Sequence, residues 1–324
     1  MRAVVVDRWM KHGDLTVSEA PDPVVGPGAI GVEVRAAGCN FFDTLIVQGQ
    51  YQVKPPFPFI PGAEVGGIVR EVGEGVLGFA VGDRVFGAAG VGGFAERVAA
   101  PAVAMMPLPE GMSFAEGAAL PIIYPTSYAG LVFRANLAAG ETLLVHAAAG
   151  GVGIAAVQIG KAIGARVIAT AGGADKLEVA RDNGADDVID YREKDFVERV
   201  MELTDGHGAD VIYDSVGGDV FDRSLKCIAW NGRLLVIGFA GGRIPEVKAN
   251  RILLKNISIV GLHWGAHVAH QPERVPETFD ALFELYAAGK IKPVIYKTYG
   301  LDEVPVALQD LASRKTYGKL IIAP

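Results

Sequence analysis

Hydrophobic residues between positions 125 and 263 gather in short runs that are separated by amphipathic or glycine-rich segments. Short apolar runs rich in β-branched residues are typical of strands buried on both faces of a sheet. The expected strands are 142–146, 165–170, 187–189, 211–214, 234–237 and 257–262. The expected helices between them are 154–160, 175–184, 194–204 and 220–229. This alternation predicts an α/β fold with a doubly wound parallel sheet.

The pattern before this region is different. Residues 1–122 are dense in Gly, Pro and Val, with short β-like runs and turn signals such as Pro61-Gly62 between them. The expected strands are 3–6, 30–36, 65–72, 83–86 and 95–99. This part of the chain therefore predicts a mostly β, barrel-like domain.

The tail after the central region mixes helices and strands. Helices are expected at 272–288 and 301–314, and strands at 294–299 and 319–323. The tail could return to the N-terminal β region and complete it. We therefore expect a discontinuous β-rich catalytic domain at 1–124 and 267–324, and a separate domain at 125–266.

The turn after the first strand of the central domain is rich in glycine. It reads Ala147-Ala148-Ala149-Gly150-Gly151-Val152-Gly153, and Gly164 is expected to end the following helix. Glycines at such a turn let the backbone approach a pyrophosphate, which the free N–H groups of the helix N-terminus attract. A merely structural turn is the alternative. A membrane span is disfavoured, because Gly150-Gly151 would interrupt the uncharged stretch 142–160 at its middle.

The end of the second expected strand indicates which dinucleotide would bind. NAD-preferring sites place an Asp or Glu there to hold the ribose 2′-hydroxyl. This chain has Thr170-Ala171-Gly172-Gly173 instead, with Lys176 soon after. A lysine near glycine backbone suits a 2′-phosphate, so NADPH is favoured over NADH, although Lys176 could also be an ordinary solvated helix residue.

Composition and charge exclude several classes of partner. The net charge is −7, with 30 basic and 37 acidic residues, and no long basic run occurs. Nucleic acid and anionic membrane surfaces are therefore not expected as partners. The two cysteines, Cys39 and Cys227, have no metal-like spacing and favour reduced thiols in a cytoplasmic setting. The first residues lack the long apolar core of a signal peptide.

An ordered set of motifs resembles a known family. The motifs are Gly38-Cys39-Asn40-Phe41-Phe42-Asp43, Gln48-Gly49-Gln50-Tyr51, Pro61-Gly62-Ala63-Glu64-Val65-Gly66-Gly67, Val81-Gly82-Asp83-Arg84-Val85, Gly93-Phe94-Ala95-Glu96, Pro125-Thr126-Ser127-Tyr128 and the glycine-rich turn. Together they resemble the zinc-independent quinone oxidoreductase branch of the medium-chain dehydrogenase/reductase superfamily. The resemblance implies a GroES-like β domain with a Rossmann-like cofactor domain, NADPH as cofactor, and reduction of quinones or α,β-unsaturated carbonyls. It also implies a homodimer joined through the cofactor domain. The apolar strand 257–261 is the expected contact, because an open sheet edge must be covered or paired.

The resemblance also implies a set of cofactor-binding residues. They are Asn40, Thr126, Gly150, Gly151, Val152, Gly153, Gly172, Lys176, Tyr191, Val216, Phe239, Leu262, Trp264 and Arg314. Among these, Gly172, Lys176, Tyr191 and Arg314 would surround the 2′-phosphate. Thr126 would orient the nicotinamide, with an ordinary helix N-cap as its alternative role.

Zinc is not expected. Zinc-dependent relatives place a Cys where this chain has Asn40 and a His where it has Ala63, and two cysteines cannot build their four-cysteine loop. The closely spaced His263, His267 and His270 are expected to be solvent or lid residues rather than ligands.

Hydride transfer from nicotinamide to a substrate in the cleft between the domains would leave charge on a carbonyl oxygen. We expect Asn40 and Tyr51 to be the catalytic donors, unless Asn40 is a loop-capping amide and Tyr51 merely packs. An enoyl-thioester reductase and a non-catalytic NADPH-binding protein stay open as alternatives.

Overall fold

The computed structural model describes residues 1–324, which form two compact units. Residues 1–122 and 293–324 make the first unit, and residues 123–292 make the second. The expected second boundary, after residue 266, is wrong, because helix α10 (Arg274–Ala287) packs on helix α3 (Ile123–Tyr128) within the second unit. The observed crossing back to the first unit therefore comes after residue 292.

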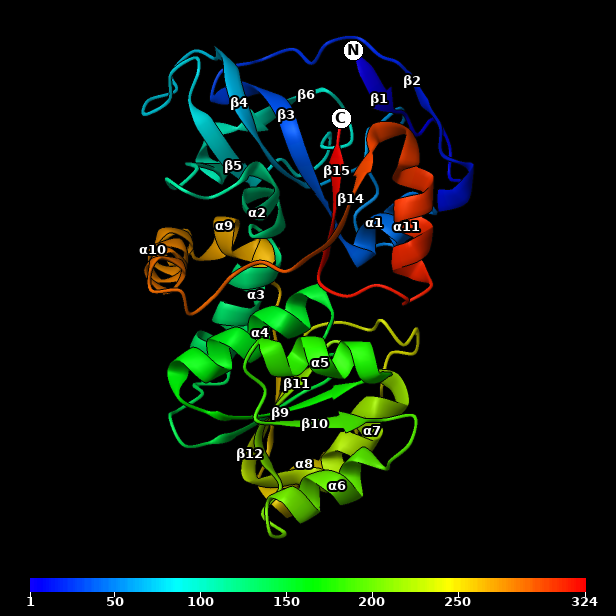
Figure 1. Ribbon diagram of the computed structural model, residues 1–324, viewed down its shortest axis with the longest axis vertical. Coiled ribbons are helices and arrows are strands. Elements are labelled where there is room, and N and C mark those ends of the chain that lie inside the picture. Colours follow the sequence, from blue (N-terminus) through cyan, green and yellow to red (C-terminus); the bar gives the residue numbers. More distant parts are fainter. The chain divides into compact units, whose positions relative to one another are not determined.

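The second unit is built on a six-stranded parallel sheet (Figure 1). In spatial order its strands are β10 (Asp187–Asp190), β9 (Arg166–Ala171), β8 (Thr142–Val145), β11 (Ala209–Asp214), β12 (Ile228–Val236) and β13 (Ser258–Gly261). This order is that of a dinucleotide-binding doubly wound sheet, in which ligands bind beyond the carboxyl ends of the strands. The expected strands are confirmed within a residue or two at their ends, except that β12 begins at Ile228, well before the expected residue 234, and takes the last residues of the expected helix 220–229.

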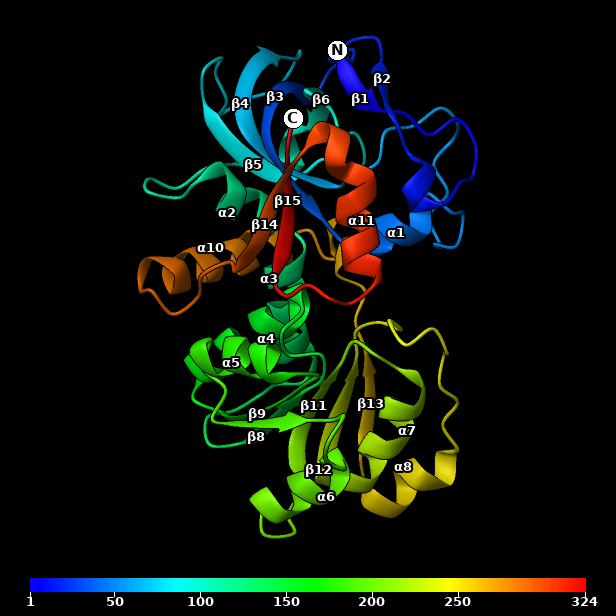
Figure 2. The ribbon, with the colours of Figure 1, turned by 45° about the vertical axis from the view of Figure 1, so that its right-hand side comes forward.

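Helices cover both faces of this sheet, as Figures 1 and 2 show. They are α4 (Gly151–Ile163), α5 (Ala174–Asp182), α6 (Phe196–Leu203), α7 (Gly218–Cys227) and α8 (Ala249–Lys255), with a short α9 (His267–His270) before α10. Helix α4 ends as expected at Gly164, whose φ of 97° is left-handed. None of the helices combines the length and the apolar character that crossing a bilayer requires.

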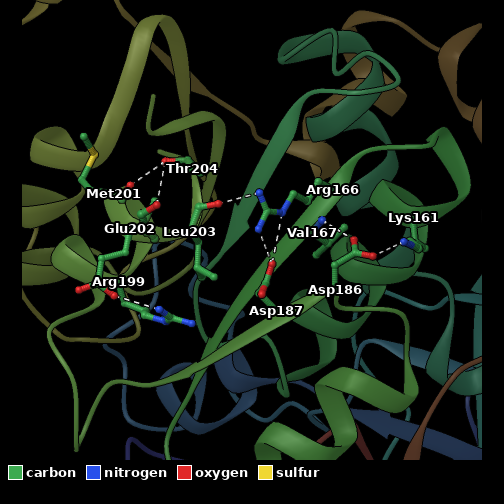
Figure 3. Close-up of polar contacts among 11 residues, drawn as sticks. Lys161, Arg166, Val167, Asp186, Asp187, Arg199, Met201, Glu202, Leu203 and Thr204 are labelled. Carbon is green, nitrogen blue, oxygen red and sulfur yellow. Dashed lines mark hydrogen bonds and ion pairs between the residues drawn. The ribbon is translucent and has the colours of Figure 1, made fainter. Parts of the chain in front are cut away.

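A network of ion pairs fixes the amino ends of β9 and β10 (Figure 3). Arg166, the first residue of β9, donates to Asp187 at 2.9 Å and to the Leu203 carbonyl at 2.7 Å. Asp186 accepts from the Val167 N–H at 2.8 Å and pairs with Lys161. Because this network lies at the amino ends of the strands, it supports the sheet at the edge opposite to the candidate ligand site.

The first unit holds a larger, mostly antiparallel sheet. Its strands are β14 (Ile295–Gly300), β15 (Lys319–Ala323), β3 (Ala29–Cys39), β4 (Glu64–Val72), β5 (Arg84–Ala88) and β7 (Met105–Pro107) in spatial order, with β6 (Arg97–Pro101) beside β3. Strands β1 (Arg2–Val4) and β2 (Val17–Glu19) pair separately. Strand β15 is antiparallel to the end of β3, with Leu320 opposite Cys39. The C-terminal strand therefore completes the N-terminal sheet.

Three helices accompany this sheet. They are α1 (Phe41–Ile46), α2 (Phe114–Ala119) and α11 (Val304–Ala312). The first two were not expected from the sequence, because each is only six residues long and lacks a helical repeat of apolar positions. Ser113 and Glu116 form a capping box at the start of α2.

Candidate active site

The glycine-rich turn between β8 and α4 has the shape of a phosphate-binding loop. Ala147 has a φ of 50°, the left-handed conformation that the first glycine of the usual motif would adopt. A Cβ on Gly153 would lie 2.3 Å from the Ala147 carbonyl oxygen, so only glycine allows the helix to start so close to the strand. The Ile154 N–H is the first to bond back along α4, to the Gly150 carbonyl at 2.8 Å. The N–H groups of Gly151, Val152 and Gly153 are therefore free to meet an anion, whereas the Gly150 N–H donates to the Ala147 carbonyl at 2.9 Å.

A buried histidine ties the carboxyl end of β8 to its neighbours. His146 Nδ1 lies 3.0 Å from the Thr170 hydroxyl, and Nε2 lies 2.8 Å from Ser224 Oγ. Ser224 donates its own proton to the Val220 carbonyl, so it accepts from Nε2–H and the tautomer is fixed. Burial lowers the pKa of His146 to about 3, so the ring is neutral. His146 therefore holds the sheet edge under the turn rather than carrying charge.

The expected phosphate-site residues Gly172 and Tyr191 do meet. A Cβ on Gly172 would lie 2.7 Å from the Tyr191 hydroxyl, so the tyrosine covers the backbone just after β9. Gly173, the N-cap of α5, is covered in the same way by the guanidinium of Arg192, at 2.6 Å from a Cβ built there. Lys176 lies half-buried in the first turn of α5. These residues form one polar surface at the carboxyl ends of β9 and β10.

Hydrogen bonds fix the turns that follow β11 and β12 at the same sheet edge. Buried Asp214, the last residue of β11, accepts from the N–H groups of Val216 at 2.8 Å and Gly217 at 3.0 Å. The Val216 carbonyl accepts from Gly241 N–H at 2.7 Å. Both backbone groups of Val216 are thus used within the protein, and only its side chain is left to contact a ligand. The Phe239 ring packs over Gly217.

The other expected residues of the second unit are spread over three elements. Thr126 lies half-buried inside α3, so its alternative role as a helix N-cap is wrong. Leu262 directly follows β13, and its N–H donates to the Val236 carbonyl at 3.4 Å. Trp264 stacks on His267 with ring centroids 4.9 Å apart. The carboxyl ends of the strands thus bring the turn residues together, whereas Thr126 comes from a separate helix.

In the first unit, Asn40 belongs to a buried ionic cluster. The Lys319 ammonium pairs with Glu64 and donates to Asn40 Oδ1 at 2.8 Å, and Asn40 Nδ2 donates to Glu64 at 2.8 Å. Lys319 and Glu64 are 2% and 0% exposed, so this is a fully buried ion pair. Glu64 also accepts from the Ile122 N–H at 3.0 Å. A Cβ on Gly38 would lie 2.5 Å from Glu64, which explains the glycine there.

Asn40 is also the N-cap of α1, as its alternative reading supposed. Its N–H donates to Asp43 at 2.7 Å in a capping box. Burial raises the pKa of Asp43 to about 7, against the opposing effect of that N–H. The Asn40 side chain therefore has fixed partners on both its oxygen and its nitrogen, and one Nδ2–H is left over.

Tyr51 lies near this cluster and is half-buried. Its ring stacks on Phe42 with centroids 5.3 Å apart, so it does pack. Burial raises the pKa of Tyr51, and the neighbouring charge of Asp43 adds to the rise. The phenol is therefore protonated at neutral pH and can donate a hydrogen bond.

Arg314 belongs to the first unit, whereas the other expected phosphate-site residues belong to the second. It is exposed, in the turn between α11 and β15, with a left-handed φ of 57°.

Sequence reasoning missed Lys319, Asp190 and Arg192. Lys319 could have been found from the sequence, because it is the one charged residue in the apolar strand 319–323. Glu64 is likewise the one charged residue in an apolar run. Charges buried in a sheet need each other as partners.

The comparisons with known proteins agree with this geometry. The sequence matches the family models described as "Zinc-binding dehydrogenase" over residues 151–286 and "Alcohol dehydrogenase GroES-like domain" over residues 26–110. It is 46% identical over 301 residues to "Quinone oxidoreductase-like protein 2 homolog" of Nematostella vectensis, which covers 92% of this chain and 82% of that protein. It is 37% identical to "Quinone oxidoreductase" of Pseudomonas aeruginosa, with 92% of each covered. The chain belongs to the quinone oxidoreductase family.

Solved structures of similar proteins match this chain over its whole length. Escherichia coli quinone oxidoreductase complexed with NADPH matches with a TM-score of 0.93 and 33% identity, over 100% of both chains. A mycobacterial protein complexed with NADPH matches with a TM-score of 0.93 and 34% identity, also over 100% of both. The predicted GroES-like domain and Rossmann-like domain of the medium-chain dehydrogenase/reductase superfamily are thereby confirmed.

Zinc, which one of the matching family descriptions mentions, does not fit the residues of this oxidoreductase. Asn40 and Ala63 stand where zinc-dependent relatives have ligands, and Asn40 is hydrogen-bonded to the Lys319 ammonium. No three His, Cys, Asp or Glu side chains come together in a group that could hold a metal ion. Burial raises the pKa of Cys39 well above its usual value, which disfavours the thiolate that zinc prefers.

Proposed function

We propose that this protein is an NADPH-dependent, zinc-independent reductase of quinones or α,β-unsaturated carbonyls. The observation that carries the proposal is the turn from β8 into α4. There Gly153 lets the helix start close to the strand, and free N–H groups at the helix N-terminus could bind the pyrophosphate of a dinucleotide. The bound NADPH of the similar Escherichia coli and mycobacterial structures supports the choice of cofactor. Gly150, Gly151, Val152 and Gly153 would hold the pyrophosphate.

When bound, NADPH would supply a hydride to the β-carbon of an enone or to a quinone. The protein's own contribution is to orient the substrate and to stabilise the negative charge that forms on its oxygen. We assign this role to the neutral donors Asn40 and Tyr51. Asn40 has a spare Nδ2–H, and the Tyr51 phenol makes no hydrogen bond within the protein and keeps its proton at neutral pH.

One experiment tests both the chemistry and the cofactor. Purified protein is mixed with NADPH or NADH and a panel of enones, quinones and enoyl thioesters, and nicotinamide oxidation is followed. We expect oxidation with enones or quinones, and an apparent affinity at least about tenfold higher for NADPH, since one charge-assisted phosphate contact suffices for that factor. Equal affinity for both cofactors would refute the NADPH assignment. NADPH binding without oxidation of any substrate would favour the non-catalytic alternative.

A second candidate is a 2-enoyl thioester reductase. The observation that favours it is Tyr51, a protonated phenol that could meet the thioester oxygen. The same panel distinguishes the two, because an enoyl thioester would then be reduced, and NADPH oxidised, faster than with simple enones and quinones.

We also propose a homodimer formed through strand β13. This strand is at the end of the six-stranded sheet, and its Ile259 and Val260 are only half-buried. An apolar edge strand is an open template for pairing, which a twofold-related copy satisfies. Light scattering of the whole chain at micromolar concentration should give twice the monomer mass of 34.0 kDa. A mass equal to that of the monomer would reject the dimer.

A further inference from the structure

The second unit does have a carboxylate at the place where NAD-preferring sites keep one, but it comes from a different strand. Asp190 is the last residue of β10 and lies opposite Ala171, the last residue of β9. Its Oδ2 accepts from the Gly173 N–H at 2.9 Å, just beyond the end of β9. A ribose-binding acid in this fold normally follows the β9 position directly in sequence. Asp190 therefore reaches the same location from the neighbouring strand.

Arg192 neutralises the charge of the Asp190 carboxylate. Its Nη2 donates to Asp190 Oδ2 at 3.0 Å, its Nε donates to Oδ1 at 3.2 Å, and its backbone N–H donates to Oδ1 at 3.0 Å. With the Gly173 N–H, four donors occupy the two oxygens. These contacts lower the pKa of Asp190 to about 2, with the Arg192 side chain as the largest cause. The carboxylate is thus charged but already saturated with donors.

The Arg192 guanidinium still has unused N–H donors after this pairing. Its Nη1 makes no hydrogen bond within the protein, and the side chain is 57% exposed. It lies over Gly173, the N-cap of α5, whose first turn holds Lys176, and it follows Tyr191 in sequence. A guanidinium can bind a phosphate through two parallel N–H groups while it keeps a carboxylate partner, because it has five donors.

We propose that Arg192 is a cofactor-specificity residue, which neutralises Asp190 and offers its remaining N–H donors to the 2′-phosphate of NADPH. The proposal rests on the proposed NADPH-dependent function. With Arg192 in place, the Asp190 charge is neutralised and the remaining guanidinium N–H donors are available to a phosphate dianion. Without it, the exposed carboxylate would repel that phosphate and could instead accept a hydrogen bond from the 2′-hydroxyl of NADH.

The test is the dissociation constant of each cofactor, NADPH and NADH, measured by titration at low ionic strength. For Arg192→Gln we expect the NADPH constant to rise about tenfold while the NADH constant stays within about twofold or falls. Adding Asp190→Asn to that variant should recover part of the lost NADPH affinity, because the repelling charge is then gone. Arg192→Lys, which keeps the charge, should lose less than Arg192→Gln.

Arg199→Gln is the matched control. Arg199 is a partly exposed arginine of the same unit that pairs with Glu202 at 2.9 Å in α6, as Figure 3 shows. It should leave both dissociation constants unchanged. If Arg192→Gln leaves the ratio of the two dissociation constants unchanged, the proposal is overturned. An equal change of both constants would then show a structural role for Arg192. No recovery on adding Asp190→Asn would refute the neutralisation of Asp190. A parent protein that binds both cofactors equally would instead refute the proposed function, whatever Arg192 does.

Discussion

Replacing Lys319 by methionine is expected to lower the free energy of unfolding by about 3–5 kcal/mol. The variant removes the ammonium that contacts Glu64, Asn40 Oδ1 and the Cys39 carbonyl. Glu64 is fully buried, so its charge would be left in the interior without its cation. Breaking one side of a buried ion pair is costly for this reason, whereas the intact pair need not be strongly stabilising. Denaturant unfolding followed by circular dichroism measures the change.

Two further variants separate the lost ion pair from a general effect of the substitution. Lys315→Met changes an exposed lysine in the turn before β15 and should shift the free energy by no more than about 0.5 kcal/mol. Combining Lys319→Met with Glu64→Gln removes both charges and should restore part of the stability. If Lys319→Met is as stable as the parent, the buried ion pair does not exist in the folded protein.

The second large effect is expected in catalysis. Tyr51→Phe and Asn40→Ala should each lower kcat with one enone by about 10²–10³, the usual loss when an oxyanion donor is removed. NADPH affinity, measured separately, should change much less in Tyr51→Phe, since the phenol is assigned to the substrate rather than to the cofactor. Steady-state rates at saturating NADPH measure the effect.

Tyr296→Phe is the control for the loss of a phenol. Tyr296 is exposed on β14 and packs edge-to-face on Tyr317, so its variant should keep the parent kcat. Asn40→Ala also removes two contacts of the buried cluster, and its unfolding must be checked alongside its rate. If both Tyr51→Phe and Asn40→Ala keep kcat within about threefold of the parent, other groups stabilise the oxyanion.

Periodic apolar patterns predicted the sheet of the second unit well, because each of its strands contains a separate short apolar run. The turn at Gly150–Gly153 and the stop at Gly164 were also readable, since both need glycine for a steric reason. Helix α1 could not be predicted from the sequence. It is short, and its start depends on Asn40 and Asp43, which look like ordinary loop residues in the sequence.

The charged partners were harder to predict than the glycines. Asp190 and Gly173 are 17 positions apart, and Glu64 and Lys319 are 255 positions apart. No local pattern relates residues that meet only through strand pairing. The missing carboxylate after β9 was correctly noted, but the carboxylate that β10 brings to the same place can be found only once the register of the two strands is known.

The position of β15 has a consequence for the order in which the chain can fold during synthesis. The ribosome adds about 5–20 residues per second, so the 255 positions between Glu64 and Lys319 take roughly 10–50 s. During this time β3 lacks its neighbour β15, and Glu64 lacks its cation. Residues 123–292 form a continuous unit and emerge before β15. The unit whose strands are made first is therefore the one that is completed last.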